Sequence, residues 1–229
     1  SKFSIFCISL NVPKLNAQSD TIQNIQYLTN WMDSIEVAIK QKKLDHLERF
    51  IENHYALAKE NPEKYSLDGW IEQIPKAAQS LWRIKDTLNT FSLLKPMFEL
   101  EWAPLTDSGM NNLGRTLNLL GVYQRSATFL NDALLSYQKA LTVFNECKVV
   151  GTRTFPVIYG NIGNTYRRLG EYAKAIEYLS ESDRFSQGFL KDPQTSKGDL
   201  PLLISDHITN LNNLGLALSN AQEFGHSTE

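Results

Sequence analysis

Apolar residues recur every three to four positions through most of the chain, with polar residues between them. This spacing predicts helices rather than strands. The clearest case is the segment 157–169, where one helical stripe is formed by Ile158, Ile162, Tyr166 and Leu169. A second stripe begins at Tyr172, so two helices joined by a short turn are expected here. The pattern therefore predicts an all-α fold.

Further helices are expected on both sides of this segment. In the first half of the chain the pattern predicts them at 20–41, 44–59, 67–92 and 91–100, and in the second half at about 125–145. Pro75 should break or kink the third helix near its start, and Asp107 is a candidate helix cap. Loops are expected at 147–154 and 191–199, the latter being rich in turn-forming residues.

Three segments of the chain share one spacing of glycines and apolar residues. They align on Gly114, Gly163 and Gly215. In each segment an apolar residue stands four positions before the glycine, another directly before it, and a third three positions after it. An aromatic residue follows the glycine by nine positions, at Tyr123, Tyr172 and Phe224. A second glycine follows the first in two of the segments, at Gly121 and Gly170, while Gln222 takes this place in the third.

The glycines have physical reasons to be where they are. A glycine inside a helix costs about 1 kcal/mol relative to alanine, so Gly163 needs a reason such as the close approach of a neighbouring helix. Gly170 suits a left-handed turn that ends the first helix of the pair.

This motif resembles the tetratricopeptide repeat, most closely in the middle segment. The resemblance implies an α-α superhelix of stacked antiparallel helical hairpins. The three anchoring glycines lie farther apart than the usual period of about 34 residues. Longer second helices and the two loops account for the excess, and the departure puts regular superhelical geometry in doubt.

We divide the chain into three parts. Residues 1–18 are expected to be the remnant of a signal peptide, and residues 19–104 an N-terminal helical region in which degenerate repeats are one alternative. Residues 105–229 form the repeat array, with units at about 105–148, 154–190 and 201–229. The last unit is truncated, because a repeat's first helix needs its second to cover it. We therefore expect a fragment, and an effector activity beyond Glu229 is one alternative.

The N-terminal residues have the pattern of an export signal. An apolar run at 3–10 follows Lys2, and Pro13 separates it from the small residues around Ala17. It resembles the signals of exported proteins of the Bacteroidetes type, which predicts a periplasmic or cell-surface location. Lys14 argues against this interpretation. The alternatives are a buried N-terminal strand or helix turn and a cytoplasmic protein.

Charge and composition exclude several classes of function. The chain has 23 Lys and Arg against 25 Asp and Glu, a net charge of -2, which does not favour binding to nucleic acid or an anionic membrane. No stretch is long and apolar enough to span a bilayer. The two cysteines, Cys7 and Cys147, do not form a disulfide framework.

The sequence contains no recognisable catalytic or metal-binding motif. The four histidines, His46, His54, His207 and His226, lack metal-ligand spacing. Neither a phosphate-binding loop nor a nucleophile elbow occurs. We therefore expect no metal, no cofactor and no enzymatic activity.

The resemblance implies a concave groove lined by the first helix of each repeat. The candidate groove residues are Asn111, Asn112, Arg115 and Asn118 in the first segment, Asn161, Asn164 and Arg167 in the second, and Asn212 and Asn213 in the third. An asparagine amide both donates and accepts hydrogen bonds, so it can pair with a peptide backbone. The arginines would attract carboxylates. Alternatively, the asparagines cap turns, bond to neighbouring helices or face solvent. Gly160 stands where a clamp for a terminal carboxylate would need lysine, which argues against that role.

The sequence thus predicts a scaffold that binds a protein or an extended peptide. The alternative is a helical sensor or docking region of a larger signalling enzyme: a histidine kinase, a transcription regulator or a CHAT-type protease. That alternative rests on analogy at the level of the fold.

Overall fold

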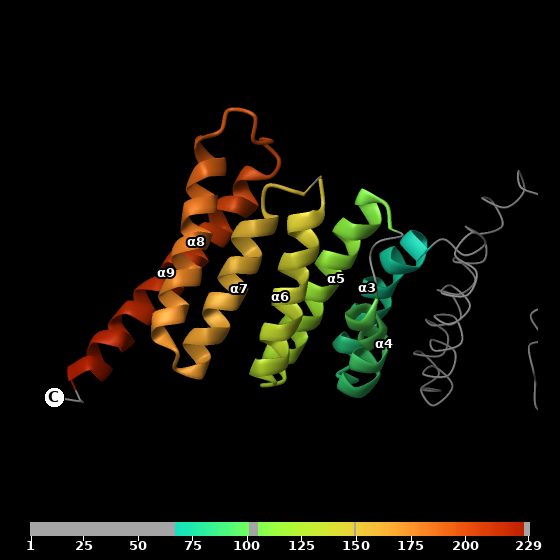
Figure 1. The fold of residues 1–229 in the computed structure, drawn as a ribbon, viewed down its shortest axis with the longest axis horizontal. Helices are drawn as coiled ribbons and strands as arrows, with labels where there is room; N and C mark the ends of the chain where they lie inside the picture. The colour runs from blue at the N-terminus through green and yellow to red at the C-terminus, as the bar shows by residue number, and fades with distance from the viewer. Residues whose placement is uncertain (1–66, 101–104, 149, 227–229) are drawn as a thin grey trace, which may run out of the picture.

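A computed structural model describes residues 67–100, 105–148 and 150–226 of the chain, and these residues form helices without any strand (Figure 1). The helices are α3 (Leu67–Arg83), α4 (Thr87–Glu99), α5 (Asp107–Ser126), α6 (Leu130–Glu146), α7 (Thr154–Leu169), α8 (Tyr172–Lys191) and α9 (Leu200–His226). The predicted all-α fold is confirmed. None of these helices combines the length and the hydropathy of a membrane span.

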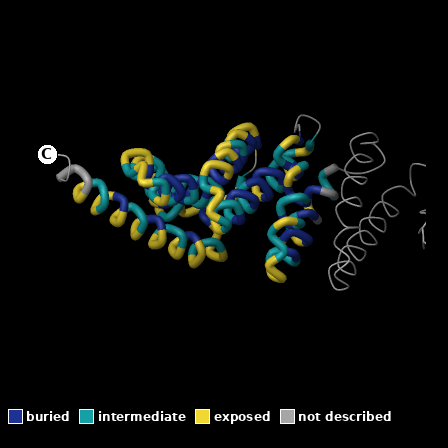
Figure 2. The backbone as a smooth tube through the Cα atoms, turned by 90° about the horizontal axis from the view of Figure 1, so that it is seen from below, coloured by how far each residue is buried: buried dark blue, intermediate teal, exposed yellow. Residues whose placement is uncertain are grey.

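The helices pack in consecutive pairs that stand side by side in one row (Figure 1). The pairs are α3 with α4, α5 with α6, and α7 with α8, while α9 packs on α8 and, less extensively, on α7. Buried residues follow the inner sides of the row from α3 to α9 (Figure 2). The predicted stacking of helical hairpins is therefore confirmed.

The pair α7–α8 forms as its residues predict. Gly170 ends α7 with a φ of 79°, in the left-handed region, and its N–H donates to carbonyls of the last turn of α7. Gly163 lets α8 approach α7, because a methyl group added at Gly163 would lie 2.6 Å from Leu179 Cγ. Both glycine predictions for this pair are confirmed.

The pair α5–α6 departs from the alignment of the repeats. Helix α5 continues past Gly121 to Ser126, so the expected start of the next helix near Arg125 is several residues too early. Gly121 is covered by the ring of Tyr137, whose Cε1 would lie 2.5 Å from an added methyl group. In this segment the second glycine therefore serves close packing rather than a turn, and the turn lies at 127–129, where Thr128 has a φ of 69°.

The N-terminal boundaries also differ from the prediction. Helix α3 runs unbroken through Pro75 and ends at Arg83. The predicted boundary between the helices at 67–92 and 91–100 therefore lies several residues too far along the sequence. The chain turns at 84–86, where Lys85 has a φ of 61° and Asp86 caps α4 by accepting from the Asn89 N–H at 3.1 Å.

The cap of α5 and the two loops complete the comparison. Thr106 is the cap of α5, accepting from the Gly109 N–H at 3.1 Å, and Asp107 lies in the first turn instead. The loops expected at 147–154 and 191–199 are confirmed to within a few residues by the ends of the helices around them. The predicted helices at 20–41 and 44–59 and the signal at 1–18 lie outside the described residues.

Helix α9 is held on its inner side by buried polar groups. The Asn210 side-chain amide donates to Ser182 Oγ at 2.6 Å and to the Pro156 carbonyl at 3.3 Å, and the Ser182 hydroxyl donates to the same carbonyl at 2.7 Å. Asn210 also covers Gly160, where an added methyl group would lie 2.3 Å from its Oδ1. These contacts join α7, α8 and α9 through one buried network.

Candidate functional site

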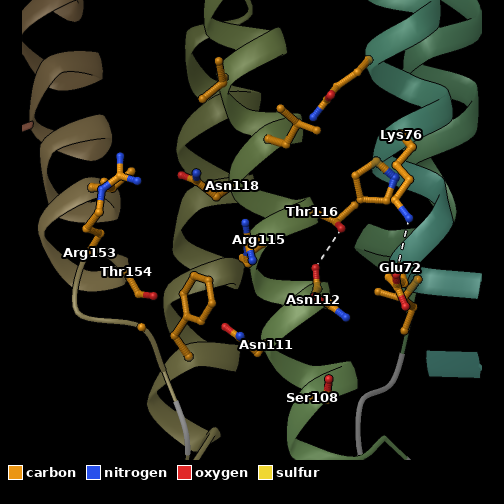
Figure 3. Close-up of a pocket in the computed structure, with 18 of the residues that line it drawn as sticks. Glu72, Lys76, Ser108, Asn111, Asn112, Arg115, Thr116, Asn118, Arg153 and Thr154 are labelled. Atoms are coloured by element: carbon orange, nitrogen blue, oxygen red, sulfur yellow. Dashed lines mark hydrogen bonds and ion pairs between the residues drawn. The ribbon is translucent and has the colours of Figure 1, made fainter. Parts of the chain in front are cut away.

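A groove of about 830 Å³ lies between α3, α5 and the start of α7. Figure 3 shows α5 in the middle of this groove, with α3 on one side and the N-terminal end of α7 on the other. The wall formed by α5 includes Ser108, Asn111, Asn112, Arg115, Asn118, Leu119 and Val122. We call this hollow the central groove.

All four candidate groove residues of the first segment line the central groove: Asn111, Asn112, Arg115 and Asn118. They do so because α5 turns the opposite stripe inward, with Leu113 and Leu117 fully buried. Residues three and four positions apart share a helix face, so the polar positions between the apolar ones must face the other way.

Helix α3 supplies a wall that the repeat motif does not contain. This wall consists of Ile71, Glu72, Pro75, Lys76 and Gln79. Lys76 and Glu72 form an exposed ion pair one turn apart, with Nζ 3.3 Å from Oε1. The helical periodicity predicted α3, but nothing in its sequence identified it as a groove wall.

The opposite rim is formed by residues that precede and begin α7. Arg153 and Thr154 lie there (Figure 3). The Arg153 guanidinium pairs with Asp206 of α9, Nε to Oδ2 at 2.7 Å. Arg115, by contrast, is exposed and forms no ion pair with any residue that the structure describes. The groove thus offers one guanidinium whose charge is not already neutralised.

Asn111 contributes an acceptor that lacks a partner. Its Oδ1 is buried, yet no donor in the described part of the chain reaches it. A buried polar atom without a hydrogen bond loses free energy relative to water, on the order of 1–3 kcal/mol. Asn111 lines the central groove, so a rotation of its side chain that turns Oδ1 toward an incoming N–H group would remove this penalty.

The candidate residues on α7 bond to protein groups. The Asn161 side chain donates to Asn118 Oδ1 at 2.9 Å and so connects α7 to α5. Asn164 Oδ1 accepts from Arg167 Nη2 at 2.9 Å, within one turn of α7. None of these three α7 residues lines the central groove.

The candidate residues on α9 also lie away from the central groove. Asn212 is exposed and Asn213 is half-buried, and neither belongs to its lining. The structure therefore brings together the four α5 candidates and joins one α7 residue to them. Their role as peptide contacts stays a prediction.

The described residues show no group of His, Cys, Asp and Glu that could hold a metal ion. Cys147 is a buried thiol whose Sγ lies 3.3 Å from the Asp107 carbonyl. His207 Nε2 lies 3.1 Å from Asp183 Oδ1 between α9 and α8. These groups join neighbouring segments of the array.

Comparison with known proteins identifies one segment. Residues 156–187 match the family model of the tetratricopeptide repeat, and the matched segment spans most of α7 and α8. No curated protein matches the chain. The match supports a tetratricopeptide-repeat protein, and repeats of this kind are generally protein-binding scaffolds without catalytic activity.

Proposed function

We propose that this chain is a non-catalytic scaffold that holds an extended polypeptide segment in the central groove. The observation that carries the proposal is the unpartnered Oδ1 of Asn111 in a groove whose α5 wall also presents the amides of Asn112 and Asn118 and the guanidinium of Arg115. The repeat at 156–187 supports protein binding in general.

The spacing of the α5 amides suits an extended backbone. Asn118 Oδ1 already accepts from Asn161, so Asn118 offers chiefly its Nδ2–H donors, whereas Asn111 offers an acceptor. Two turns of α5 separate the two residues, about 10 Å along the axis. An extended chain covers that distance in about three residues. One peptide can therefore donate an N–H to Asn111 and accept from Asn118 without bending.

Arg115 lies between the two asparagines along α5 and adds a preference for acidic side chains. Its guanidinium can form a two-pronged contact with a carboxylate. The other cations of the groove are already paired, Lys76 with Glu72 and Arg153 with Asp206. We therefore expect the bound segment to carry an Asp or Glu near its centre.

The experiment selects binding peptides from a random displayed library and measures their affinity for variants by fluorescence anisotropy. Asn111→Ala combined with Asn118→Ala should weaken binding about 10- to 100-fold, because two hydrogen bonds of about 1 kcal/mol each are lost. The matched control is Asn164→Ala, an asparagine of α7 outside the groove, which should leave the affinity unchanged. Equal affinity of the double variant and the wild type, with both folded, would refute the groove as the binding site.

The docking region of a larger signalling enzyme gains no support from any observation on the described residues. Export to the periplasm or cell surface likewise stays a prediction, which N-terminal sequencing of the native protein tests.

A further inference from the structure

Two arginines from different helical pairs meet at the edge of the array where the hairpin turns lie. Arg125 is in the last turn of α5, and Arg168 is in the last turn of α7. The Arg168 side chain donates from Nη1 to the Arg125 carbonyl at 2.8 Å. Figure 1 shows this edge at the lower ends of α5 and α7, beside the turns into α6 and α8. The fold thus brings together two cations that stand 43 positions apart in the sequence.

Neither guanidinium is neutralised by a carboxylate of the residues that the structure describes. Arg153 and Arg184, by contrast, each form an ion pair with an acidic side chain. A cation near the C-terminal end of a helix is favourable, and the Arg168 hydrogen bond satisfies a carbonyl at the end of α5. A guanidinium has five N–H donors, however, and this bond uses one of them. The helix ends therefore do not explain why two like charges, which repel each other, are placed together.

A buried hydroxyl group extends toward the same place. Tyr137 of α6 is 0% exposed, and its Oη has no hydrogen-bond partner in the described part of the chain. Its ring lies over Gly121, one turn before Arg125 on the same face of α5. Side chains on a helix lean toward its N-terminus. Because α6 returns antiparallel to α5 (Figure 1), the Tyr137 hydroxyl is directed toward the end of α5 where Arg125 lies.

The electrostatics of Tyr137 agree with this placement. Burial raises the pKa of Tyr137, and the charges of Arg125 and Arg168 partly oppose the rise. Both guanidiniums are therefore close enough to the hydroxyl to act on it. Two cations without a counter-ion and one hydroxyl without an acceptor converge at this edge of the array.

The number of charges and donors indicates which kind of anion fits. A carboxylate has one charge and two oxygens, and a single guanidinium already matches it in a two-pronged contact. A phosphate group on a side chain carries a charge between about −1.5 and −2 at neutral pH and three acceptor oxygens. It therefore matches two guanidiniums and one hydroxyl donor, whereas a carboxylate would leave one cation without a partner.

We propose that Arg125, Arg168 and Tyr137 form a binding site for a phosphate group, which is either carried by a partner protein or free in solution. The two guanidiniums neutralise the phosphate, and the Tyr137 hydroxyl donates to one of its oxygens. This hydroxyl is closed to solvent, so the last contact requires an arginine side chain to turn away. Arg168 is exposed, and its guanidinium is held by one described hydrogen bond, so its side chain can make this movement.

This phosphate site is separate from the central groove. None of its three residues belongs to the lining of the groove. The inference therefore goes beyond the proposed peptide binding, and the failure of one would not affect the other.

Isothermal titration calorimetry of the full chain with inorganic phosphate tests the proposal. The wild type should show saturable binding. Arg125→Ala and Arg168→Ala should each weaken it about 10-fold or more, and Tyr137→Phe about 5- to 10-fold, because each removes a hydrogen bond to a charged group. The matched control is Arg115→Ala, which removes an unpaired guanidinium from the same helix as Arg125 but from the central groove. This control should bind phosphate like the wild type, and circular dichroism should show unchanged helix content in all four variants.

A phosphoserine peptide with glycines on both sides distinguishes the two sources of the phosphate group. Tighter binding of this peptide than of inorganic phosphate would support a phosphorylated partner protein, and the reverse order would support free phosphate. The same peptide with glutamate in place of phosphoserine should bind at least about 10-fold more weakly, since it offers less charge and fewer oxygens.

Three results would overturn the proposal. The first is a wild type that binds neither inorganic phosphate nor the phosphoserine peptide. The second is an equal loss of affinity in Arg115→Ala and Arg168→Ala, which would indicate non-specific attraction to positive charge. The third is equal affinity for the phosphoserine and glutamate peptides. Unchanged phosphate binding in Tyr137→Phe would contradict the part assigned to the hydroxyl.

Discussion

The Gly163 face of α7 and the Gly215 face of α9 have the same pattern of residues but different surroundings. On α7 the glycine lies against Leu179 of α8, and Tyr166 beside it is buried. On α9 the glycine is open and Leu218 beside it is exposed. The comparison teaches that the motif specifies a helix face able to receive a second helix. Whether that face is covered depends on residues outside the motif.

The largest expected effect is on the covered face. Gly163→Leu should lower the free energy of unfolding by about 3 kcal/mol or more, because overpacking a tight helix contact forces the backbones apart. The added side chain would meet the Leu179 backbone N and the Ala175 carbonyl, both about 3 Å from its Cβ. Urea denaturation measures the loss. The same substitution at Gly215, where nothing described lies within 4 Å, is the control. A similar loss at both sites would contradict the difference between the two faces.

The covered face of α5 around Gly121 can be tested by measuring stability as a function of pH. Burial raises the pKa of Tyr137, which packs over Gly121, to about 12, with Arg125 and Arg168 partly opposing the rise. Above pH 10 the unfolded chain loses this proton while the folded chain keeps it. The free energy of unfolding should therefore fall between pH 10 and pH 12 by up to about 3 kcal/mol.

Urea denaturation across that pH range measures this fall. Tyr137→Phe is the control, since it removes the ionisable group and should flatten the profile. At neutral pH it should cost little, because the Tyr137 hydroxyl has no hydrogen-bond partner among the described residues. An equally steep fall in Tyr137→Phe would assign the pH dependence to other groups.

The buried network around Asn210 should contribute strongly to the attachment of α9 to α7 and α8. Asn210→Ala removes the donor to Ser182 and Pro156 and leaves buried acceptors, at a cost of about 1–3 kcal/mol. Hydrogen exchange should show faster opening in α9 than in α5. Asn212→Ala, an exposed asparagine of the same helix, is the matched control and should change nothing measurable. Unchanged protection of α9 in Asn210→Ala would show that the buried network does not hold this helix.

The smallest effect is expected on the open face. Gly215→Ala should raise the free energy of unfolding of the monomer by up to about 1 kcal/mol, because alanine favours the helix and meets no neighbour. Thermal unfolding at low concentration measures the gain. Destabilisation under these conditions would mean that the face is covered within one chain.

Much of the fold could be predicted from local patterns. The pair α7–α8 followed from one apolar stripe on each side of Gly170, since a left-handed glycine ends a helix wherever it occurs. Gly121 lies inside α5 instead, because whether a glycine ends a helix or admits a ring depends on a residue of another helix, here Tyr137. The resemblance to the repeat motif predicted the groove positions of the four α5 candidates, whereas the α3 wall carried no motif.

The sequence by itself determined the helices of the repeat at 154–191, the turn at Gly170 and the polar face of α5 that lines the groove. These features depend on backbone preferences and on spacings within one helix or between adjacent helices. Only the tertiary structure decided that α3 closes the groove and that Asn161 bonds to Asn118 instead of facing a ligand. Each of these depends on contacts between helices far apart in the chain, which no local pattern encodes.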